Sequence, residues 1–577
     1  LWLGAQDAGG NLLVAANTYR NAGNDFWAGP INATTLVPDS TYAYDFDYVW
    51  TAKRFEIEAH IQDYVADGII NGPIPRNVLI WPGRGNLQLA QEMGFALPDQ
   101  ELAPFFDRNN NGFYEPLAGD YPVYDHNRAD AVAEDMLWYV YNDGAALHTQ
   151  TNGQPLHAEV QVTAWSFHCQ ADTLLNHTIF VRHKVWNRSG LDWFDYKMGL
   201  WHDVDLGCSS DDFFGVDTSS NTVYWYNRSN NDVNPCSPGG PVGYGPNPPA
   251  QAMTFLNQPL NSVIYHINSA SDPKGDPTSS IGYYNLLSGK WKNGEPLRAT
   301  GVGYAPSSSA PITQHAFHGA VNVFGDWSMY GINATGLDNR EVAATHAPLV
   351  RAGAAFTLDA AYSYHRYAQQ NNIGNALMAL QAIPQVQQWY HNNLVFPNCQ
   401  QQSVCTQNCV YPGDMNNNGI ASDFDLLDWG VAVGQAAAAA PRSTAADNWF
   451  PHQPPSPATN AYTDANGDGS IDDWDWDANT QNIDLTHSLY TGASEGFNTI
   501  GPELTLERRG SIIPGLPYDT IANRGAGLSF HVNFGSLAQP ISNAYALTFR
   551  LDYDPDVFYA YQPPTYISNT LAGKPRA

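Results

Sequence analysis

The chain has 577 residues, 43% hydrophobic and 13% aromatic, with 56 acidic and 26 basic side chains and a net charge of -30. This charge argues against nucleic acid and anionic membranes as partners and suits divalent cations, while the apolar content excludes a wholly disordered chain. The length predicts three or four domains. No apolar run reaches about 18 residues, so no membrane insertion is predicted.

Residues 1–400 are expected to form a large β-rich region. Apolar and polar residues alternate between Gly, Asn and Pro positions, which is typical of antiparallel strands. Strands are predicted at 12–15, 54–60 and 178–186. The stretch 225–310 is rich in Gly, Pro, Asn and Ser and predicts long surface loops. The predicted fold class is therefore mainly β, with multidomain antiparallel β-sandwiches and long loops, and we expect two packed sandwiches that divide near residue 150.

Residues 107–120 are the first of three segments with the pattern of a calcium loop. Calcium takes six to eight oxygen ligands, which Asp and Asn supply at alternate positions around a Gly where the backbone turns sharply. Here Gly112 is at position six and Glu115 at position nine. The predicted ligands are Asp107, Asn109, Asn111, Phe113 through its carbonyl, and Asp120. An ordinary turn is the alternative, since Asn, Asp and Gly tolerate a left-handed backbone.

Five aspartates form a separate acidic set at the end of a predicted strand. They are Asp203, Asp205, Asp211, Asp212 and Asp217. Clustered carboxylates at a strand end suit a further metal ion or acid–base chemistry. An exposed acidic loop explains them equally well, and the pattern leaves all three interpretations open.

The cysteines indicate disulfide bonds and an oxidising, extracellular compartment. They are Cys169, Cys208, Cys236, Cys399, Cys405 and Cys409. Cys208 and Cys236 flank a loop rich in Gly, Asn and Pro and are predicted to pair. Two of the three cysteines between 399 and 409 are predicted to pair locally, and the third to reach Cys169. A zinc site is the alternative for this cluster, but the CxxC spacing typical of such sites is absent.

Hydrophobic spacing changes to a helical period between residues 371 and 392. Ile373, Leu377, Leu380 and Ile383 recur at intervals of three and four residues. Because Pro384 follows and a proline inside a helix removes a backbone hydrogen bond, a broken helix is predicted.

Residues 410–488 are predicted to form a small, partly helical calcium module with two loops. In the stronger loop, 464–475, Gly469 is at position six and the ligands are spaced at positions 1, 3, 5, 7, 9 and 12. They are Asp464, Asn466, Asp468, Ser470 through its carbonyl, Asp472 and Asp475. The loop 414–425 has fewer charges and is expected to bind more weakly. Its predicted ligands are Asp414, Asn416, Asn418, Ile420, Ser422 and Asp425.

Residues 503–577 return to strand alternation. Strand candidates lie at 502–507, 527–534, 543–553 and 556–561. An Ig-like sandwich needs about seven strands, so a partial Ig-like or cohesin-like β-sandwich is predicted here. A neighbouring subunit, further residues of the same chain or residues 1–400 would cover its open face.

The chain lacks the sequence signatures of several enzyme classes. It has no HExxH zinc motif and no phosphate-binding Gly-rich loop. No catalytic residue is therefore predicted, and the protein is not expected to be an enzyme. Two glycosidase carboxylates need not be close in sequence, however, and aromatic side chains could line a sugar platform, so a glycan-binding or glycan-degrading secreted enzyme is the alternative.

Several phrases together resemble a large family of secreted Bacteroidetes proteins exported by the type IX system. They lie at 1–4, 23–30, 81–85, 107–112, 119–122, 137–143, 199–201 and 211–218. The unit 411–487 is similar to the dockerin-like module of these proteins, and the segment after it resembles their cohesin-like or Ig-like sandwich. Asp rather than Glu closes both later calcium loops, which is more similar to a dockerin than to an EF-hand sensor and implies a structural role.

The resemblance implies export to the cell surface and the use of calcium, but no assigned reaction. Members usually extend in both directions, so the chain is expected to be the middle portion of a longer precursor. O-glycans in such proteins follow Asp, which implies candidate sites at Ser40, Thr173 and Thr520. The predicted function is a calcium-stabilised structural glycoprotein of the cell surface, a subunit of a filament, sheath or adhesive layer, with copies of itself or other surface proteins as partners and glycans as further candidates.

Overall fold

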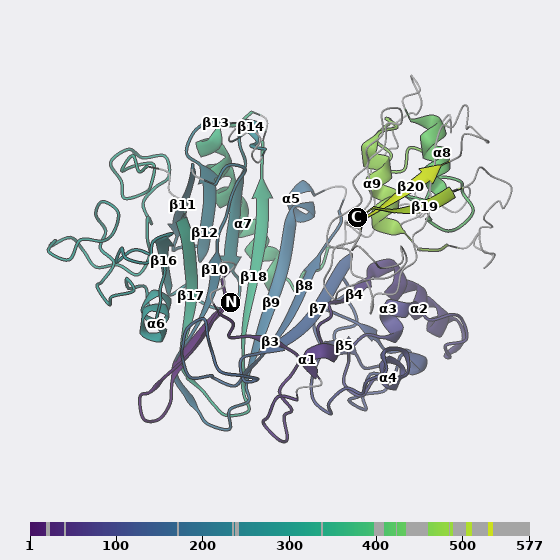
Figure 1. Ribbon diagram of the computed structural model, residues 1–577, viewed down its shortest axis with the longest axis horizontal. Helices are drawn as coiled ribbons and strands as arrows, with labels where there is room; N and C mark the ends of the chain where they lie inside the picture. The colour runs from purple at the N-terminus through teal and green to yellow at the C-terminus, as the bar shows by residue number, and fades with distance from the viewer. Residues whose placement is uncertain are drawn as a thin grey trace, which may run out of the picture. The chain divides into compact units, whose positions relative to one another are not determined.

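A computed structural model describes most of the chain (Figure 1). The described residues are 1–18, 23–39, 42–169, 172–209, 211–233, 236, 242–335, 339–367, 369–396, 409–422, 424–433, 460–483 and 485–487, with the backbone of 504–509 and 529–534. The chain divides into two compact units, Leu1–Gln400 and Gln401–Ala577. The first unit is mainly β, as predicted, and its sheets are antiparallel.

The larger sheet of the first unit has nine strands. They are β3 (Trp27–Ala28), β4 (Trp50–Lys53), β7 (Asp135–Asn142), β8 (Ala158–Ser166), β9 (Thr178–Asn187), β11 (Asp212–Asp217), β12 (Thr222–Asn227), β15 (Ala250–Phe255) and β18 (Ala355–His365). Eight follow the order β11-β12-β15-β18-β9-β8-β7-β3, and β4 also pairs with β7. β9 confirms the strand predicted at 178–186.

The smaller sheet has five strands in the order β16-β17-β10-β1-β2. They are β1 (Trp2–Gln6), β2 (Leu12–Ala16), β10 (Trp193–His202), β16 (Ser262–Ile267) and β17 (Asn339–Val350). β2 confirms the strand predicted at 12–15. Strands from before and after residue 150 share each of the two sheets, so these sheets do not separate at that point, and residues 1–400 belong to one compact unit.

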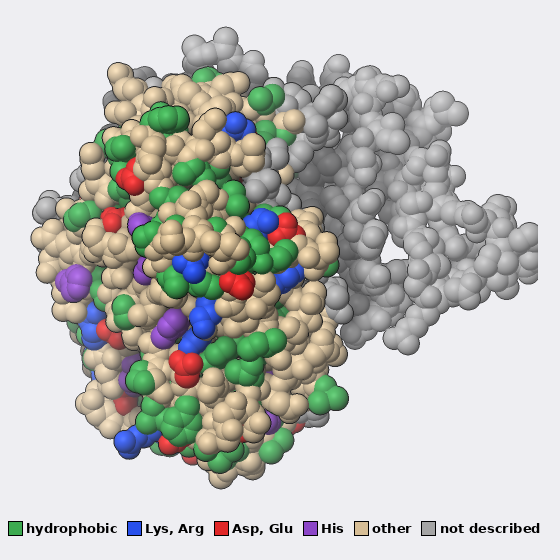
Figure 2. All heavy atoms as spheres, turned by 90° about the vertical axis from the view of Figure 1, so that its left-hand side faces the viewer, with side chains coloured by type: hydrophobic (Ala, Val, Ile, Leu, Met, Phe, Trp, Pro, Cys, Tyr) green, Lys and Arg blue, Asp and Glu red, His purple; other side chains and the backbone are tan. Residues whose placement is uncertain are grey.

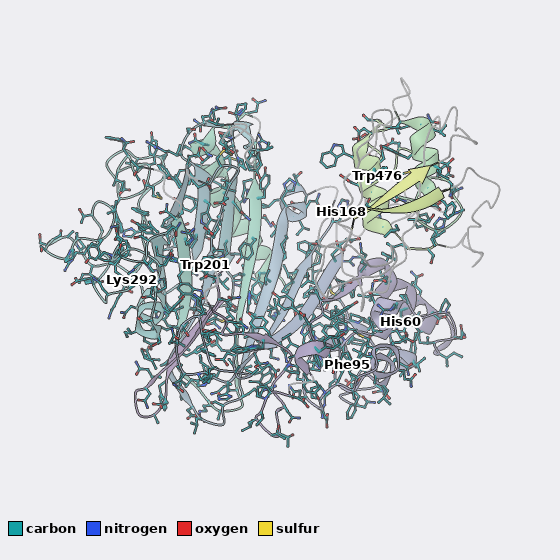
Figure 3. All side chains as sticks on the ribbon, viewed as in Figure 1. His60, Phe95, His168, Trp201, Lys292 and Trp476 are labelled. Atoms are coloured by element: carbon teal, nitrogen blue, oxygen red, sulfur yellow. A yellow bond between two sulfur atoms is a disulfide. The ribbon has the colours of Figure 1, made fainter. Side chains whose placement is uncertain are left out.

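One continuous hydrophobic core joins the two sheets to the helices α6 (Ser280–Leu287) and α7 (Asn372–His391). Trp2 of β1 is fully buried in it, with its ring stacked on Trp201 of β10 and edge-on to Tyr283 of α6. Figure 3 labels Trp201 among the strands. The two sheets are therefore packed in a sandwich-like arrangement.

A second hydrophobic cluster lies around strands β4 and β7 and the short helices that follow β4. These are α2 (Arg54–Asp67), α3 (Arg76–Leu79) and α4 (Leu87–Met93). The cluster also contains Phe105 and Tyr121, which belong to the strand pair β5 (Phe105–Phe106) and β6 (Tyr121–Pro122). This pair flanks the segment 107–120, so the predicted calcium loop is anchored at both ends in a packed core.

The strand predicted at 54–60 is wrong, because these residues begin helix α2. Seven alternating residues suggested a strand, but the buried residues are Glu56, Ile57 and His60, which recur at helical spacing. The Lys53 N–H donates to the Glu56 carboxylate, so the Glu56 side chain caps the start of the helix. Gly68 ends it in a left-handed conformation with φ 86°.

The predicted break at Pro384 is also wrong, because α7 runs through it for 20 residues. Asn371 starts the helix by accepting a hydrogen bond from the Gly374 N–H. Buried side chains lie on both sides of the proline, Ala376 and Ala379 before it and Val386 and Trp389 after it. Packing along the whole helix thus outweighs the backbone hydrogen bond that Pro384 cannot make.

The second unit contains two short helices, α8 (Asp425–Ala432) and α9 (Asp473–Asn482). Its described hydrophobic core is formed by Met415, Trp429, Ala432, Ala465, Ile471 and Ala478. Further along, β19 (Leu504–Arg509) pairs with β20 (Ser529–Phe534) in an antiparallel ribbon, in agreement with two predicted strands. The candidates at 543–553 and 556–561, and with them most of the predicted partial sandwich, lie outside the described residues.

Candidate functional site

The three predicted calcium loops share one backbone conformation. In each loop, positions four and six have positive φ. These residues are Asn110 and Gly112, Asn417 and Gly419, and Gly467 and Gly469, with φ between 56° and 97°. Two left-handed residues at the same spacing in three separate segments indicate a common loop rather than three unrelated turns.

The first aspartate of each loop accepts a hydrogen bond from the N–H at position six. Asp107 accepts from Gly112 at 2.6 Å, Asp414 from Gly419 at 2.9 Å and Asp464 from Gly469 at 3.2 Å. A second loop N–H donates to the other oxygen of each carboxylate. The first aspartate of each loop is thus held by two backbone N–H groups, at positions five and six in loops 107–120 and 414–425 and at positions four and six in loop 464–475.

The side-chain oxygens at positions three and five are also oriented by hydrogen bonds from the loop backbone. Each accepts from the N–H two residues further along, at 2.8–3.1 Å. The acceptors are Asn109 and Asn111, Asn416 and Asn418, and Asn466 and Asp468. The alternating oxygens predicted from the sequence are therefore fixed by local backbone geometry.

A buried aspartate closes each loop. Asp425 accepts from the N–H groups of Asn416 and Ser422, and Asp475 accepts from those of Asn466 and Asp472. In the loop of the first unit, the closing residue is Asp120, which accepts from the N–H groups of Arg108 at 2.9 Å and Glu115 at 2.8 Å. The prediction that included Asp120, which lies beyond a twelve-residue frame, agrees with this geometry.

Negative charge is concentrated inside these loops. The first and closing aspartates are all buried: Asp107, Asp120, Asp414, Asp425, Asp464 and Asp475. Burial, helped by the neighbouring Asp464 and Asp468, raises the pKa of Asp475 to about 7. Burial, helped by Asp107 and Glu115, raises the pKa of Asp120 to about 6. The loops therefore enclose carboxylates whose charge a cation would stabilise.

The donor set fits calcium and not a softer metal. All the side-chain donors are oxygens, and the predicted backbone donors are the carbonyls of Phe113, Ile420 and Ser470. One side chain has a competing role, because Asp472 caps α9 by accepting from the Trp474 N–H. When bound, calcium would link the first aspartate of a loop to the closing one.

The two loops of the second unit are connected by the helices that follow them. The Trp429 indole of α8 donates to the Asp472 carbonyl at 2.9 Å, and Asn479 of α9 donates to the Gly413 carbonyl at 2.7 Å. His487 contacts Asp414 at 2.7 Å and stacks on Tyr411 with ring centroids 3.8 Å apart. Each loop therefore supports the other.

The loop of the first unit is fixed by its surroundings. Tyr114, which is buried, donates its hydroxyl hydrogen to the Val78 carbonyl at 2.6 Å. His60 of α2 contacts the Asp120 carbonyl at 3.0 Å, and Figure 3 labels this histidine. The Arg108 guanidinium lies 4.2 Å from the centre of the Tyr64 ring. No helix follows this loop directly, since strand β6 begins at Tyr121.

The acidic set predicted from the sequence is divided by the structure. Asp217 is held by Ser219 and Ser220, whose groups donate to it and lower its pKa. Asp203 forms an ion pair with Arg340 at 3.5 Å. Asp211 and Asp212 lie together at the start of β11, and burial raises the pKa of Asp212 to about 8.

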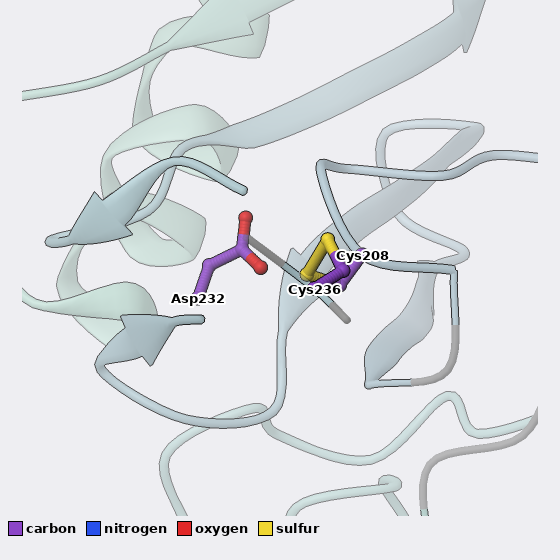
Figure 4. Close-up of side chains that lie close together, drawn as sticks. All are labelled: Cys208, Asp232 and Cys236. Atoms are coloured by element: carbon purple, nitrogen blue, oxygen red, sulfur yellow. A yellow bond between two sulfur atoms is a disulfide. The ribbon is translucent and has the colours of Figure 1, made fainter. Parts of the chain in front are cut away.

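The predicted Cys208–Cys236 disulfide is confirmed. Cys208, Cys236 and Asp232 also lie within 4.8 Å of one another (Figure 4). Both sulfurs are in the disulfide, so neither is available as a thiolate ligand. Cys169 and Cys409 are also disulfide-bonded, which argues against the zinc alternative for Cys409; Cys399 and Cys405 lie outside the described residues.

Of the three predicted glycosylation sites, Thr173 is described. Its side chain is exposed at the first position of α5 (Thr173–Asn176), and Asp172 before it caps this helix by accepting from the Leu175 N–H. A glycan on this hydroxyl would not meet a packed surface. Ser40 and Thr520 lie outside the described residues.

Two buried histidines near acidic groups, His148 and His266, have both ring nitrogens engaged in structural contacts. His266 contacts Asp276 through Nδ1 at 2.9 Å, but its Nε2 accepts from the Trp201 indole at 3.0 Å. His148 contacts the carbonyls of Val14 and Asp143. In these two places the ring has no nitrogen left to activate a nucleophile.

No protein-family model and no curated protein matches this chain. Among the residues that the structure describes, no helix is both long enough and apolar enough to span a bilayer.

Proposed function

We propose that this protein is a calcium-stabilised structural or adhesive protein of the cell surface. The observation that supports this most is the shared conformation of the three loops 107–120, 414–425 and 464–475. Each fixes two buried aspartates and alternating side-chain oxygens through its own backbone. Because the loops are built into the fold rather than exposed as separate clusters, calcium would act as a structural staple.

Two independent features support the proposed location. The Cys208–Cys236 disulfide is compatible with an extracellular protein. One face of the molecule shows acidic, basic and hydrophobic side chains dispersed among neutral polar groups (Figure 2). Such a surface, on a chain with a net charge of -30, suits a soluble environment containing millimolar calcium, where sites of moderate affinity are filled.

The proposed structural role requires the protein to assemble with copies of itself. It is tested by light scattering and electron microscopy of the purified chain with calcium and with a chelator. We expect calcium-dependent oligomers or filaments. A protein that stays monomeric at high concentration with calcium present would contradict a structural role as a polymer subunit, although calcium binding by the loops would stand.

A glycan-binding role is the second candidate, and one groove of about 280 Å³ favours it. Aromatic side chains dominate its lining: Phe26, Trp27, Tyr48, Tyr139 and Tyr141, with Asp47 at the same groove. Tyr48 is 39% exposed and packs edge-on against Trp50. Exposed aromatic faces beside a carboxylate are suited to stack on sugar rings and to accept hydrogen bonds from hydroxyl groups.

Binding to an array of immobilised glycans tests this second candidate. Tyr48→Ala should abolish binding if the groove holds the sugar. Tyr44→Ala is the matched control, because Tyr44 is 87% exposed and does not line the groove. Equal binding by both variants, or no binding by the wild type, would remove the glycan-binding candidate.

A further inference from the structure

Three buried carboxylate oxygens in the first unit have no hydrogen-bond partner. Across the described residues, these are the carboxylate oxygens that are buried and unpaired, and they belong to Asp211, Asp212 and Asp232. All three lie near the Cys208–Cys236 disulfide in sequence. Asp212 accepts from Leu206 and Asp232 lies against the adjacent Gly207, so these two carboxylates are neighbours, and a buried anionic oxygen without a donor is unfavourable.

Other buried acids in this unit are satisfied. Asp143 is fully buried, and its two oxygens accept from the N–H groups of Leu156 and Ala158 at 2.6 Å each. Asp359 is 1% exposed and forms an ion pair with Arg182 at 2.8 Å. The fold therefore supplies donors or cations to buried carboxylates elsewhere, and the set around Asp212 and Asp232 is the exception.

In Asp212 and Asp232, one carboxylate oxygen accepts a hydrogen bond and the other has no partner. Asp212, 7% exposed, accepts from the Leu206 N–H through Oδ2 at 2.9 Å. Asp232, which is fully buried on β13 (Asn231–Asp232), accepts from the Tyr244 N–H through Oδ2 at 2.6 Å. In both residues Oδ1 is the unpaired atom. The side chains are thus held in place while each keeps one oxygen available.

The backbone around Asp232 is closed in by two glycines and a disulfide. A Cβ on Gly207, which has φ +85°, would lie 1.9 Å from Asp232 Oδ2, and one on Gly243 would lie 2.7 Å from Oδ1. The disulfide ties the segment after Gly207 to the segment after Asp232 (Figure 4). Larger residues at these two positions would displace the carboxylate, so the chain makes room for it.

We propose that Asp212 and Asp232 bind a divalent cation, and that the Cys208–Cys236 disulfide clamps the two segments that carry the ligands. The unpaired oxygens are hard donors, which favours calcium. Its residues belong to none of the three loops, so binding here does not require their ligands. The competing explanation is that protons, rather than a metal ion, neutralise these acids.

Calcium counting by native mass spectrometry tests the proposal on the full chain. The double variant Asp212→Asn and Asp232→Asn should bind one calcium fewer than the wild type. Asp217→Asn is the matched control, because Asp217 lies on the same strand and is held by Ser219 and Ser220; it should bind as many as the wild type. An unchanged count in the double variant overturns the site.

A second measurement needs no substitution at the site, so a variant that fails to fold does not weaken the test. In a chain whose three loops are disabled by Asp107→Ala, Asp414→Ala and Asp464→Ala, reduction of Cys208–Cys236 by dithiothreitol is followed by peptide mapping. Calcium at about ten times its Kd should slow reduction about tenfold, since opening must release the ion. A reduction rate independent of calcium shows that protons neutralise the acids, and the proposal is wrong whatever the loops bind.

Discussion

The two units contain the same calcium-loop geometry in very different surroundings. In the first unit, loop 107–120 is attached to an extensive core that includes Trp81, Trp138 and Trp165. In the second unit, the described core around loops 414–425 and 464–475 consists of a few side chains, of which Trp429 is the largest. A small core supplies little stability by itself. The same loop should therefore be a local staple in the first unit and a condition for folding in the second.

The hydrogen bonds agree with this difference. In the second unit, the helices α8 and α9 contact the loops directly, as in the bond from Trp429 to the Asp472 carbonyl. If a loop opens, the helix that follows it loses its first turn. In the first unit, the loop is held by contacts from outside, such as the bond from Tyr114 to the Val78 carbonyl, and these do not need an ion.

The largest effect is expected from disabling both loops of the second unit. The double variant Asp414→Ala and Asp464→Ala removes two first ligands and the acceptors of the loop N–H groups. With calcium at about 100 times its Kd, each disabled loop loses about 2.7 kcal/mol of binding free energy, or about 5.4 kcal/mol for the two, which lowers the Tm of a unit the size of Gln401–Ala577 by about 10–20 °C. Thermal unfolding monitored by calorimetry checks this.

Asp477→Ala is the control for that experiment. Asp477 is exposed on α9, between the buried Asp475 and Ala478, and is not a predicted ligand. It should leave the calcium response intact. If both proteins lose the same stability, the effect comes from the helix and not from the ion.

A smaller effect is expected at the loop of the first unit. Asp120→Asn keeps a hydrogen-bond acceptor but removes the negative charge that closes the loop. We expect the Tm to fall by about 2–4 °C. Amide hydrogen exchange should become faster only in residues 107–120. Asp99→Asn is a suitable comparison, because Asp99 forms an exposed ion pair with Arg84 and such pairs contribute little. Unfolding of the whole unit by Asp120→Asn would show that the two units do not differ as described.

A further effect, of similar size, concerns pH and involves no metal. Glu341 is buried, accepts from the Trp225 indole at 2.9 Å, and has its pKa raised by burial from 4.5 to about 8. Because the folded state holds this proton more tightly, its stabilising contribution is complete below pH 4.5 and is lost as pH rises to about 8. When the pH is raised from 6 to 9, the Tm of Glu341→Gln should fall by about 3 °C less than the Tm of the wild type.

Glu92→Gln, at an exposed position, should follow the wild-type pH curve. If the Tm of Glu341→Gln and the Tm of the wild type change equally with pH, ionisation of Glu341 does not destabilise the folded state. This experiment probes the first unit alone and gives its intrinsic stability, against which the calcium effects can be measured.

The conformation of the three predicted calcium loops could be anticipated from the sequence because it is local. The ligand spacing and the left-handed positions depend on neighbouring residues such as Asp464, Asn466 and Gly469. Helix α2 could not be predicted in this way, since the alternation at 54–60 fits a strand as well as a helix. The packing that selects the helix involves Ile57 and His60 against distant regions of the first unit.

The acidic set also shows that closeness in sequence does not determine which side chains lie together in the fold. Five neighbouring aspartates were grouped by proximity in sequence, but Asp217 and Asp203 have other partners, and Asp232 was missed because it lies twenty residues after Asp212. The predicted Cys208–Cys236 disulfide is the available signal, because Cys208 lies four residues before Asp212 and Cys236 four residues after Asp232.

Calorimetry of the full chain, with calcium and with a chelator, tests the central difference between the two units most directly. Two transitions are expected. Chelation should lower the Tm of the smaller transition by about 10–20 °C and that of the larger one by only a few degrees. If chelation leaves both transitions unchanged, or lowers both by the same amount, calcium does not hold the second unit together in the way its two loops indicate.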